Sequence, residues 1–130
     1  MHFHRAADDG AHVRAFYDDL TDAMADAPYP SGWRKGVYPT QAFLDASIAH
    51  GELFLAELDG VLTGCMVLNH AYNDGYAAVT WAADVPDAQL LVIHALGVHP
   101  AFARRGIAQR MVQYAIGTAR PQGCRALRLD

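Results

Sequence analysis

The residues best suited to chemistry form a short basic turn, Ala103-Arg104-Arg105-Gly106-Ile107-Ala108. This turn joins an apolar run to a stretch whose apolar residues recur at helical spacing. A helix that begins here presents free backbone N–H groups and the positive end of its dipole, and two arginines add charge. The pattern predicts a binding site for phosphate groups. The alternative is an ordinary helix start with solvated arginines.

Two elements must position this turn. Before it, residues 90–98 are apolar except for His94 and Gly97, which is typical of a strand covered on both faces. After it, residues 108–119 place their apolar side chains on one face and predict an amphipathic helix. The turn is therefore expected where a central strand leads into a long helix.

Turn and cap signals predict the other elements. Asp8 or Asp9 is expected to cap a first helix and Thr40 a second, and Asp59-Gly60 predicts a hairpin. Strands are expected over residues 1–6, 52–58, 61–69, 90–98 and 124–129. The order β-α-α-β-β-β-α-β predicts an α/β fold of the α+β type, with a mainly antiparallel sheet flanked by helices. We expect a single domain over residues 1–130.

Composition restricts the ligand class. With 130 residues, 52% hydrophobic and 18% charged, the chain has the composition of one globular domain. Its formal charge of −4 is divided unevenly, because residues 1–100 carry −9 and residues 101–130 carry +5. A basic C-terminal part on an acidic protein predicts a small anionic ligand and no nucleic acid, which would need a broader basic surface.

Cysteine and histidine positions predict no metal site. Cys65 and Cys124 lie in apolar surroundings and have no metal-ligand spacing, so we expect buried reduced thiols. The seven histidines show no spacing that would gather metal ligands. No apolar run approaches the ~20 residues that cross a bilayer. No membrane association and a cytoplasmic location are therefore expected.

The segment from the strand to the helix resembles a known family. Leu96-x-Val98-x-Pro100 is followed by Ala103-Arg-Arg-Gly106-Ile-Ala108, which is similar to the Gln/Arg-x-x-Gly-x-Gly/Ala signature of the GCN5-related N-acetyltransferases, the GNAT superfamily. Ala103 replaces the opening Gln/Arg, which removes a side-chain contact but keeps the backbone amide. The predicted element order also matches this family's fold through its fifth strand.

The resemblance implies acetyl-CoA as cosubstrate and assigns its contacts. The backbone of Leu96 and Val98 would bond the pantetheine arm, with Gly97 between them permitting a bulge. The Leu96 amide would also polarise the thioester carbonyl. The diphosphate would bind the turn, namely Ala103, Arg104, Arg105, Gly106, Ile107 and Ala108.

A closer local resemblance concerns the catalytic base. Residues 93–102, Ile-His-Ala-Leu-Gly-Val-His-Pro-Ala-Phe, are similar to the matching segment of the arylalkylamine N-acetyltransferases. This similarity implies that His94 deprotonates the amine, directly or through water, a role that suits imidazole. The alternative is a core histidine bonded to a neighbouring carbonyl. Tyr114 lies on the wrong helix for the family's general acid and is expected to be a half-buried packing residue.

The acceptor site is expected at the loop between the first two helices, which in this family often walls the acceptor. This implies contacts from Tyr29, Trp33 and Tyr38, although these aromatic residues could instead anchor the loop.

The sequence therefore predicts an N-acetyltransferase that moves the acetyl group from acetyl-CoA to a primary amine of a small molecule or peptide. Direct attack in a ternary complex is expected. The alternative is a non-catalytic, CoA-binding module with a regulatory or structural role. The chain stops at Asp130, where the fifth strand would finish and before the helix that usually follows in the family. We expect either that the sequence is cut short here or that a partner subunit, in a homodimer, covers this strand edge.

Overall fold

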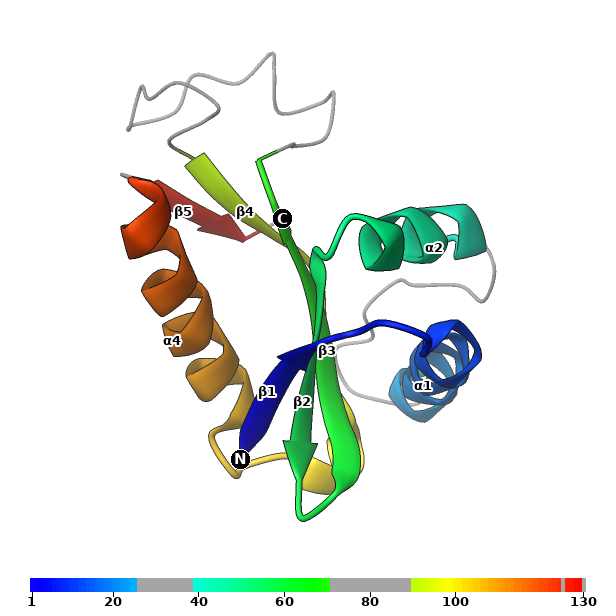
Figure 1. Cartoon of the computed structure of the whole chain (residues 1–130). Helices are drawn as coiled ribbons and strands as arrows, with labels where there is room; N and C mark the ends of the chain where they lie inside the picture. Colours follow the sequence, from blue (N-terminus) through cyan, green and yellow to red (C-terminus); the bar gives the residue numbers. More distant parts are fainter. Residues whose placement is uncertain (26–38, 71–89, 125, 130) are drawn as a thin grey trace.

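The computed structural model describes residues 1–25, 39–70, 90–124 and 126–129. The strands are β1 (His2–Arg5), β2 (Leu53–Leu58), β3 (Val61–Asn69), β4 (Leu90–Val98) and β5 (Ala126–Leu129). The helices are α1 (Gly10–Met24), α2 (Gln41–Ala49) and α4 (Ile107–Ala119), and two short 3-10 turns are η2 (Pro100–Phe102) and η3 (Arg120–Gln122). Figure 1 shows their arrangement.

The strands form one sheet in the order β1-β2-β3-β4-β5. Neighbouring strands are antiparallel from β1 to β4, and β5 lies parallel to β4. The chain reaches β5 through α4, which is the crossover that a parallel pair requires. This architecture confirms the predicted α+β fold and its mainly antiparallel mixed sheet.

Helices cover both faces of the sheet (Figure 1). α1 and α2 bury apolar side chains such as Phe16, Tyr17 and Leu44 against one face. α4 buries Ile107 and Met111 against the opposite face. Because β4 is an interior strand covered on both faces, its residues from 90 to 95 are all buried, as its apolar run predicts.

Local signals explain several element boundaries. Asp59 and Gly60 both have positive φ, 53° and 79°, which is the backbone of a tight hairpin turn between β2 and β3. Thr40 caps α2, since its hydroxyl accepts a hydrogen bond from the Phe43 amide at 3.1 Å. Asp9 is the N-cap residue of α1, but its side chain makes no hydrogen bond to the first amides of the helix. Its carboxylate instead accepts a hydrogen bond from the Ala7 amide at 2.9 Å.

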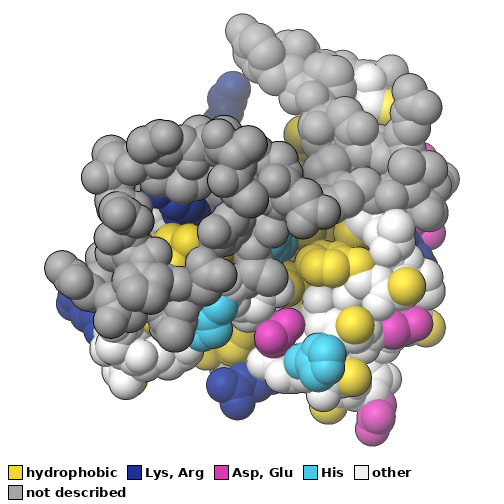
Figure 2. All heavy atoms as spheres, turned by 90° about the horizontal axis from the view of Figure 1, so that it is seen from above, with side chains coloured by type: hydrophobic (Ala, Val, Ile, Leu, Met, Phe, Trp, Pro, Cys, Tyr) yellow, Lys and Arg dark blue, Asp and Glu magenta, His cyan; other side chains and the backbone are white. Residues whose placement is uncertain are grey.

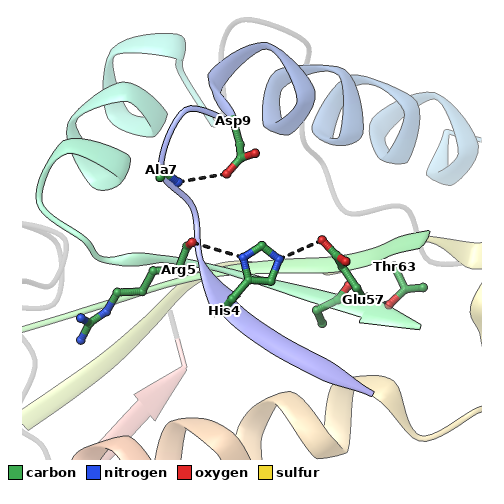
Figure 3. Close-up of polar contacts among 7 residues, drawn as sticks. His4, Arg5, Ala7, Asp9, Glu57 and Thr63 are labelled. Atoms are coloured by element: carbon green, nitrogen blue, oxygen red, sulfur yellow. Dashed lines mark hydrogen bonds and ion pairs between the residues drawn. The ribbon is translucent and has the colours of Figure 1, made fainter. Parts of the chain in front are cut away.

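A cross-strand contact holds β1 to its neighbour. His4 Nε2 lies 2.8 Å from Glu57 Oε1 on β2, as Figure 3 shows. The hydrogen bond to Glu57 raises the pKa of His4 above its usual value, although partial burial opposes the shift. This edge of the sheet therefore carries a contact whose strength depends on pH.

Candidate active site

One edge of β4 has no strand partner among the described residues where the expected cosubstrate contacts lie. β5 pairs with β4 only from Leu90 to Ile93. Within the part of the chain that the structure describes, no strand pairs with that edge over residues 94–98. The predicted residues Leu96 and Val98 therefore lie where β4 has N–H and C=O groups available to an extended ligand.

A β-bulge interrupts β4 beside this edge. Val67 of β3 pairs with His94 and Cys65 pairs with Gly97, so the single residue between them on β3 faces both Ala95 and Leu96. Ala95 has φ 51°, a left-handed conformation that costs a residue with a Cβ roughly 1 kcal/mol. The prediction that Gly97 permits the bulge is wrong, because Gly97 keeps regular pairing and the bulge lies at Ala95–Leu96.

A residue of α1, which packs on one face of the sheet, holds the bulge through a hydrogen bond. The hydroxyl of Tyr17 donates a hydrogen bond to the Ala95 carbonyl at 2.7 Å. Tyr17 is completely buried, and Ala95 is 2% exposed. Sequence reasoning missed this contact, because Tyr17 reads only as one of the apolar positions of an amphipathic helix.

His94 lies at the point where β4 and β5 part. It is 5% exposed, and its Nε2 lies 2.8 Å from Oδ1 of Asn69 on β3. The ring of Phe43 on α2 meets it edge-on, with 6.2 Å between centroids. His94 is therefore held in one orientation by two other elements. Asn69 was also missed, since no local motif connects the end of β3 with the middle of β4.

The basic turn between η2 and α4 has the backbone of an anion site. Gly106 caps α4 with φ 71° and has no side chain that could bond the helix's first amides. Ile107 is 2% exposed and anchors the turn in the core, whereas Arg104 and Arg105 are exposed. The Arg105 guanidinium also lies 5.6 Å from the centre of the Phe102 ring. The first amides of a helix, which lack partners within the helix, together with the helix dipole and two guanidinium groups favour a bound anion.

The predicted site residues have different outcomes. His94, Leu96, Gly97 and Val98 follow one another on β4, and the turn of residues 103–108 follows after η2. The structure therefore places the expected cosubstrate contacts along one continuous stretch. The expected acceptor contacts Tyr29, Trp33 and Tyr38 lie outside the described residues.

Charge is divided between the two sides of the sheet. α1 and α2 carry Asp18, Asp19, Asp22 and Asp45 against one basic residue, Arg14, which pairs with Asp18. α4 and its preceding turn carry Arg104, Arg105 and Arg110. In Figure 2 the acidic side chains gather on the right, on the α1 and α2 side, and most basic ones lie toward the α4 side. An anion is thus favoured on one side of the sheet and a cation on the other.

Both cysteines are free thiols, but Cys124 is half-buried, so the prediction of a buried thiol is wrong there. Cys65 is fully buried, and burial raises the pKa of its thiol well above the usual range, so it is not available as a thiolate. Tyr114 is half-buried on α4 and packs against other side chains, as predicted. Its ring lies on those of Phe3 and Phe54 at centroid distances of 4.7 and 5.6 Å.

In residues 1–25, 39–70, 90–124 and 126–129, no three His, Cys, Asp or Glu side chains gather as metal ligands. None of the helices in these segments is long and apolar enough to span a bilayer.

Comparison with known families identifies the class. The sequence model of the acetyltransferase (GNAT) family matches residues 13–130. The chain therefore belongs to the GNAT family of acetyltransferases. No curated protein sequence matches it significantly.

Solved structures share the fold at low sequence identity. A GNAT family acetyltransferase from Streptococcus agalactiae superposes with a TM-score of 0.75 and 18% identity, covering 90% of this chain and 69% of that one. A GNAT family acetyltransferase from Brucella melitensis, solved with acetyl-CoA, superposes with a TM-score of 0.66 and 18% identity, covering 98% of this chain and 73% of that one. The aminoglycoside N-acetyltransferase AAC(6')-Iy has been solved with CoA and also with a bisubstrate analogue. Its CoA complex superposes with a TM-score of 0.64 and 18% identity, covering 99% of this chain and 75% of that one.

Proposed function

We propose that this chain is an acetyl-CoA-dependent N-acetyltransferase that acts on a primary amine of a small molecule or peptide. The observation that carries the proposal is the edge of β4 over residues 94–98, which no described strand pairs with and which is followed, after η2, by the turn of residues 103–108. CoA has an extended arm with two amide groups and a diphosphate. An open strand edge suits the arm, and a glycine-capped helix start suits the diphosphate. Membership in the GNAT family supports this choice.

Each part of the cosubstrate is assigned to a different feature. The diphosphate would bind the amides that follow Ala103, with charge from Arg104 and Arg105. Gly106 would allow close approach of the backbone, since its position has no Cβ. The pantetheine arm would bond the main chain of Leu96 and Val98. These contacts use the backbone, which explains why Ala103 can replace the Gln/Arg of the family signature.

The proposed reaction is direct transfer in a ternary complex. The neutral amine nitrogen attacks the thioester carbonyl, and the Leu96 amide donates a hydrogen bond to the oxygen that becomes negative. The C–S bond then breaks, and CoA leaves as a thiolate that takes up a proton. His94 accepts the proton that the amine loses, directly or through water. The bisubstrate analogue bound by AAC(6')-Iy agrees with such a ternary geometry in that relative.

The acceptor is proposed to be cationic before it loses its proton. The acidic residues of α1 and α2, such as Asp19 and Asp45, would attract an ammonium group to this side of the sheet. Tyr29, Trp33 and Tyr38 are proposed to wall the acceptor site. A homodimer through the β5 edge and a cytoplasmic location stay predictions from the sequence.

The experiment mixes the purified protein with acetyl-CoA and a panel of small amines, polyamines, peptides and aminoglycosides. Release of the CoA thiol and the mass of the product are followed together. Thiol release matched by a 1:1 acetylated product supports the enzyme. Calorimetric binding of CoA without thiol release for any amine would favour the non-catalytic module. Absence of CoA binding would overturn both proposals.

A further inference from the structure

Tyr17 lies one layer behind the proposed site and reaches β4 through its hydroxyl. The hydroxyl donates to the Ala95 carbonyl at 2.7 Å, and no part of the Tyr17 side chain is exposed. Because both residues are shielded from solvent, water cannot readily replace this hydrogen bond if it is lost. The contact therefore links α1 to β4 at one fixed point, between two segments 78 residues apart in sequence.

Ala95 needs such a link because its backbone is strained. Its φ of 51° is disfavoured for any residue with a Cβ, so the surrounding structure must hold it. The pairs Val67–His94 and Cys65–Gly97 fix β4 on both sides of the bulge, but Ala95 and Leu96 together face a single β3 residue. The ladder alone therefore does not determine the direction of the peptide groups at the bulge.

We propose that Tyr17 is a positioning residue for acetyl transfer. Its hydrogen bond holds Ala95 in the bulge and so sets the directions of the His94 side chain and the Leu96 amide, which flank Ala95. The inference rests on the proposed function, in which these two groups handle the amine proton and the thioester oxygen. Reacting groups must meet within narrow distances, so a small rotation at Ala95 would displace both groups at once.

The chain contains a matched control for a hydroxyl that holds a bulge. Thr63 of β3 lies at the register shift between Ala56 and Glu57, and its Oγ1 donates to the Ala56 carbonyl at 3.0 Å. Thr63 is also completely buried. Tyr17→Phe and Thr63→Val each delete one buried hydroxyl and keep the shape of the side chain. Only the first deletion concerns the bulge at the proposed site.

The kinetic test compares these variants at a temperature where circular dichroism shows both to be folded. Tyr17→Phe should lower kcat by about tenfold or more, and the Kd for CoA should rise by a smaller factor, because the proposed diphosphate contacts at residues 103–108 are not disturbed. Thr63→Val should leave kcat within about twofold of wild type, even if it lowers the melting temperature as much as Tyr17→Phe does. If Tyr17→Phe keeps the wild-type kcat, or Thr63→Val loses as much activity, the positioning role is wrong.

A second measurement does not depend on turnover. Amide resonances and hydrogen exchange of residues 94–97 are recorded for the wild type and both variants in the absence of substrate. Tyr17→Phe should shift the Leu96 resonance and speed the exchange of the hydrogen-bonded amides beside the bulge by about tenfold, whereas Thr63→Val should leave both unchanged. Unchanged Leu96 signals in Tyr17→Phe would overturn the inference. A wild-type protein that acetylates no amine would instead overturn the proposed function, and these signals would still decide whether Tyr17 holds the bulge.

Discussion

His94 is enclosed by side chains from two other elements, Asn69 of β3 and Phe43 of α2. This enclosure limits rotation of the imidazole, which a proton acceptor at a fixed distance from its substrate requires. The contact with the Asn69 side-chain carbonyl also fits the predicted alternative, a core histidine satisfied by a neighbouring carbonyl, so this contact does not distinguish the two roles. The role of His94 as the base stays a prediction and can be tested through the pH dependence of the rate.

We predict that His94→Gln lowers kcat by about 100-fold near neutral pH, because proton transfer by a positioned base contributes about that factor or more. The loss should shrink at high pH, where more of the alkylamine is already neutral in solution. The measurement is kcat from about pH 6 to about pH 10 with one amine. His50→Gln, at an exposed histidine after α2, is the control and should leave the profile unchanged. A constant loss at every pH would argue against the base assignment.

The contact between His4 and Glu57 should make stability depend on pH. Because folding raises the pKa of His4, its protonated form stabilises the protein below the unfolded-state pKa of about 6.5, and this contribution is lost as pH rises through the folded value. Glu57→Gln should therefore destabilise more at about pH 5.5 than at about pH 8.5. Both side chains are partly exposed, so we expect at most about 0.5 kcal/mol.

Urea unfolding at the two pH values measures this difference. In a protein that already carries His4→Gln, adding Glu57→Gln should change the free energy of unfolding equally at both pH values. An equal effect of Glu57→Gln at both pH values would show that the bond does not depend on His4 protonation.

Single residues also show where sequence reasoning works and where it stops. The Thr40 cap and the Asp59-Gly60 turn could be predicted, because both depend on residues a few positions apart. The bulge was expected at Gly97 because glycine tolerates unusual backbone. It lies instead at Ala95, where a distant hydroxyl, that of Tyr17, supports a conformation that alanine does not favour.

At the scale of elements, the fold was more predictable than the site. Apolar periodicity and turn signals locate strands and helices, and the handedness of crossovers leaves few ways to connect them. The point where β4 and β5 separate depends on how far two segments pair, with Ile93–Leu129 as the last pair. No local pattern in either segment marks that point.

The two ends of α4 provide a matched pair of glycines. Gly106 before the helix has φ 71° and Gly123 after η3 has φ 75°, and a Cβ at either position would meet no atom within 4 Å. Alanine should therefore cost each position about 1 kcal/mol through backbone strain alone. Only Gly106 belongs to the proposed diphosphate site.

We predict that Gly106→Ala weakens CoA binding by about tenfold or more, because its Cβ and any relaxation of φ disturb the amides that face the diphosphate. Gly123→Ala should lower the melting temperature similarly and leave the Kd for CoA within about twofold. Isothermal calorimetry with CoA and thermal unfolding provide the two readouts. Equal losses of CoA affinity in both variants would place the diphosphate elsewhere.

At the scale of the whole molecule, charge separation should affect the two substrates differently. Asp19→Asn removes an exposed charge from α1 and should lower kcat/KM for a diamine by about twofold to fivefold at low salt. The effect should fade in about 0.5 M salt, where the Debye length is only a few ångströms. Arg110→Gln on α4 is the reciprocal control and should raise KM for acetyl-CoA without affecting the diamine. A diamine rate that Asp19→Asn does not change would contradict this steering.

The left-handed residues near the site, Ala95, Arg104 and Gly106, also bear on how such a protein can diverge. A binding site made of main-chain groups constrains the signs of a few dihedral angles more than the identities of side chains. Many substitutions can then accumulate while the ligand-binding geometry persists, which is consistent with a shared fold at 18% identity. Acceptor preference can change through neighbouring side chains during this drift, since the proposed main-chain contacts to the cosubstrate do not depend on those side chains.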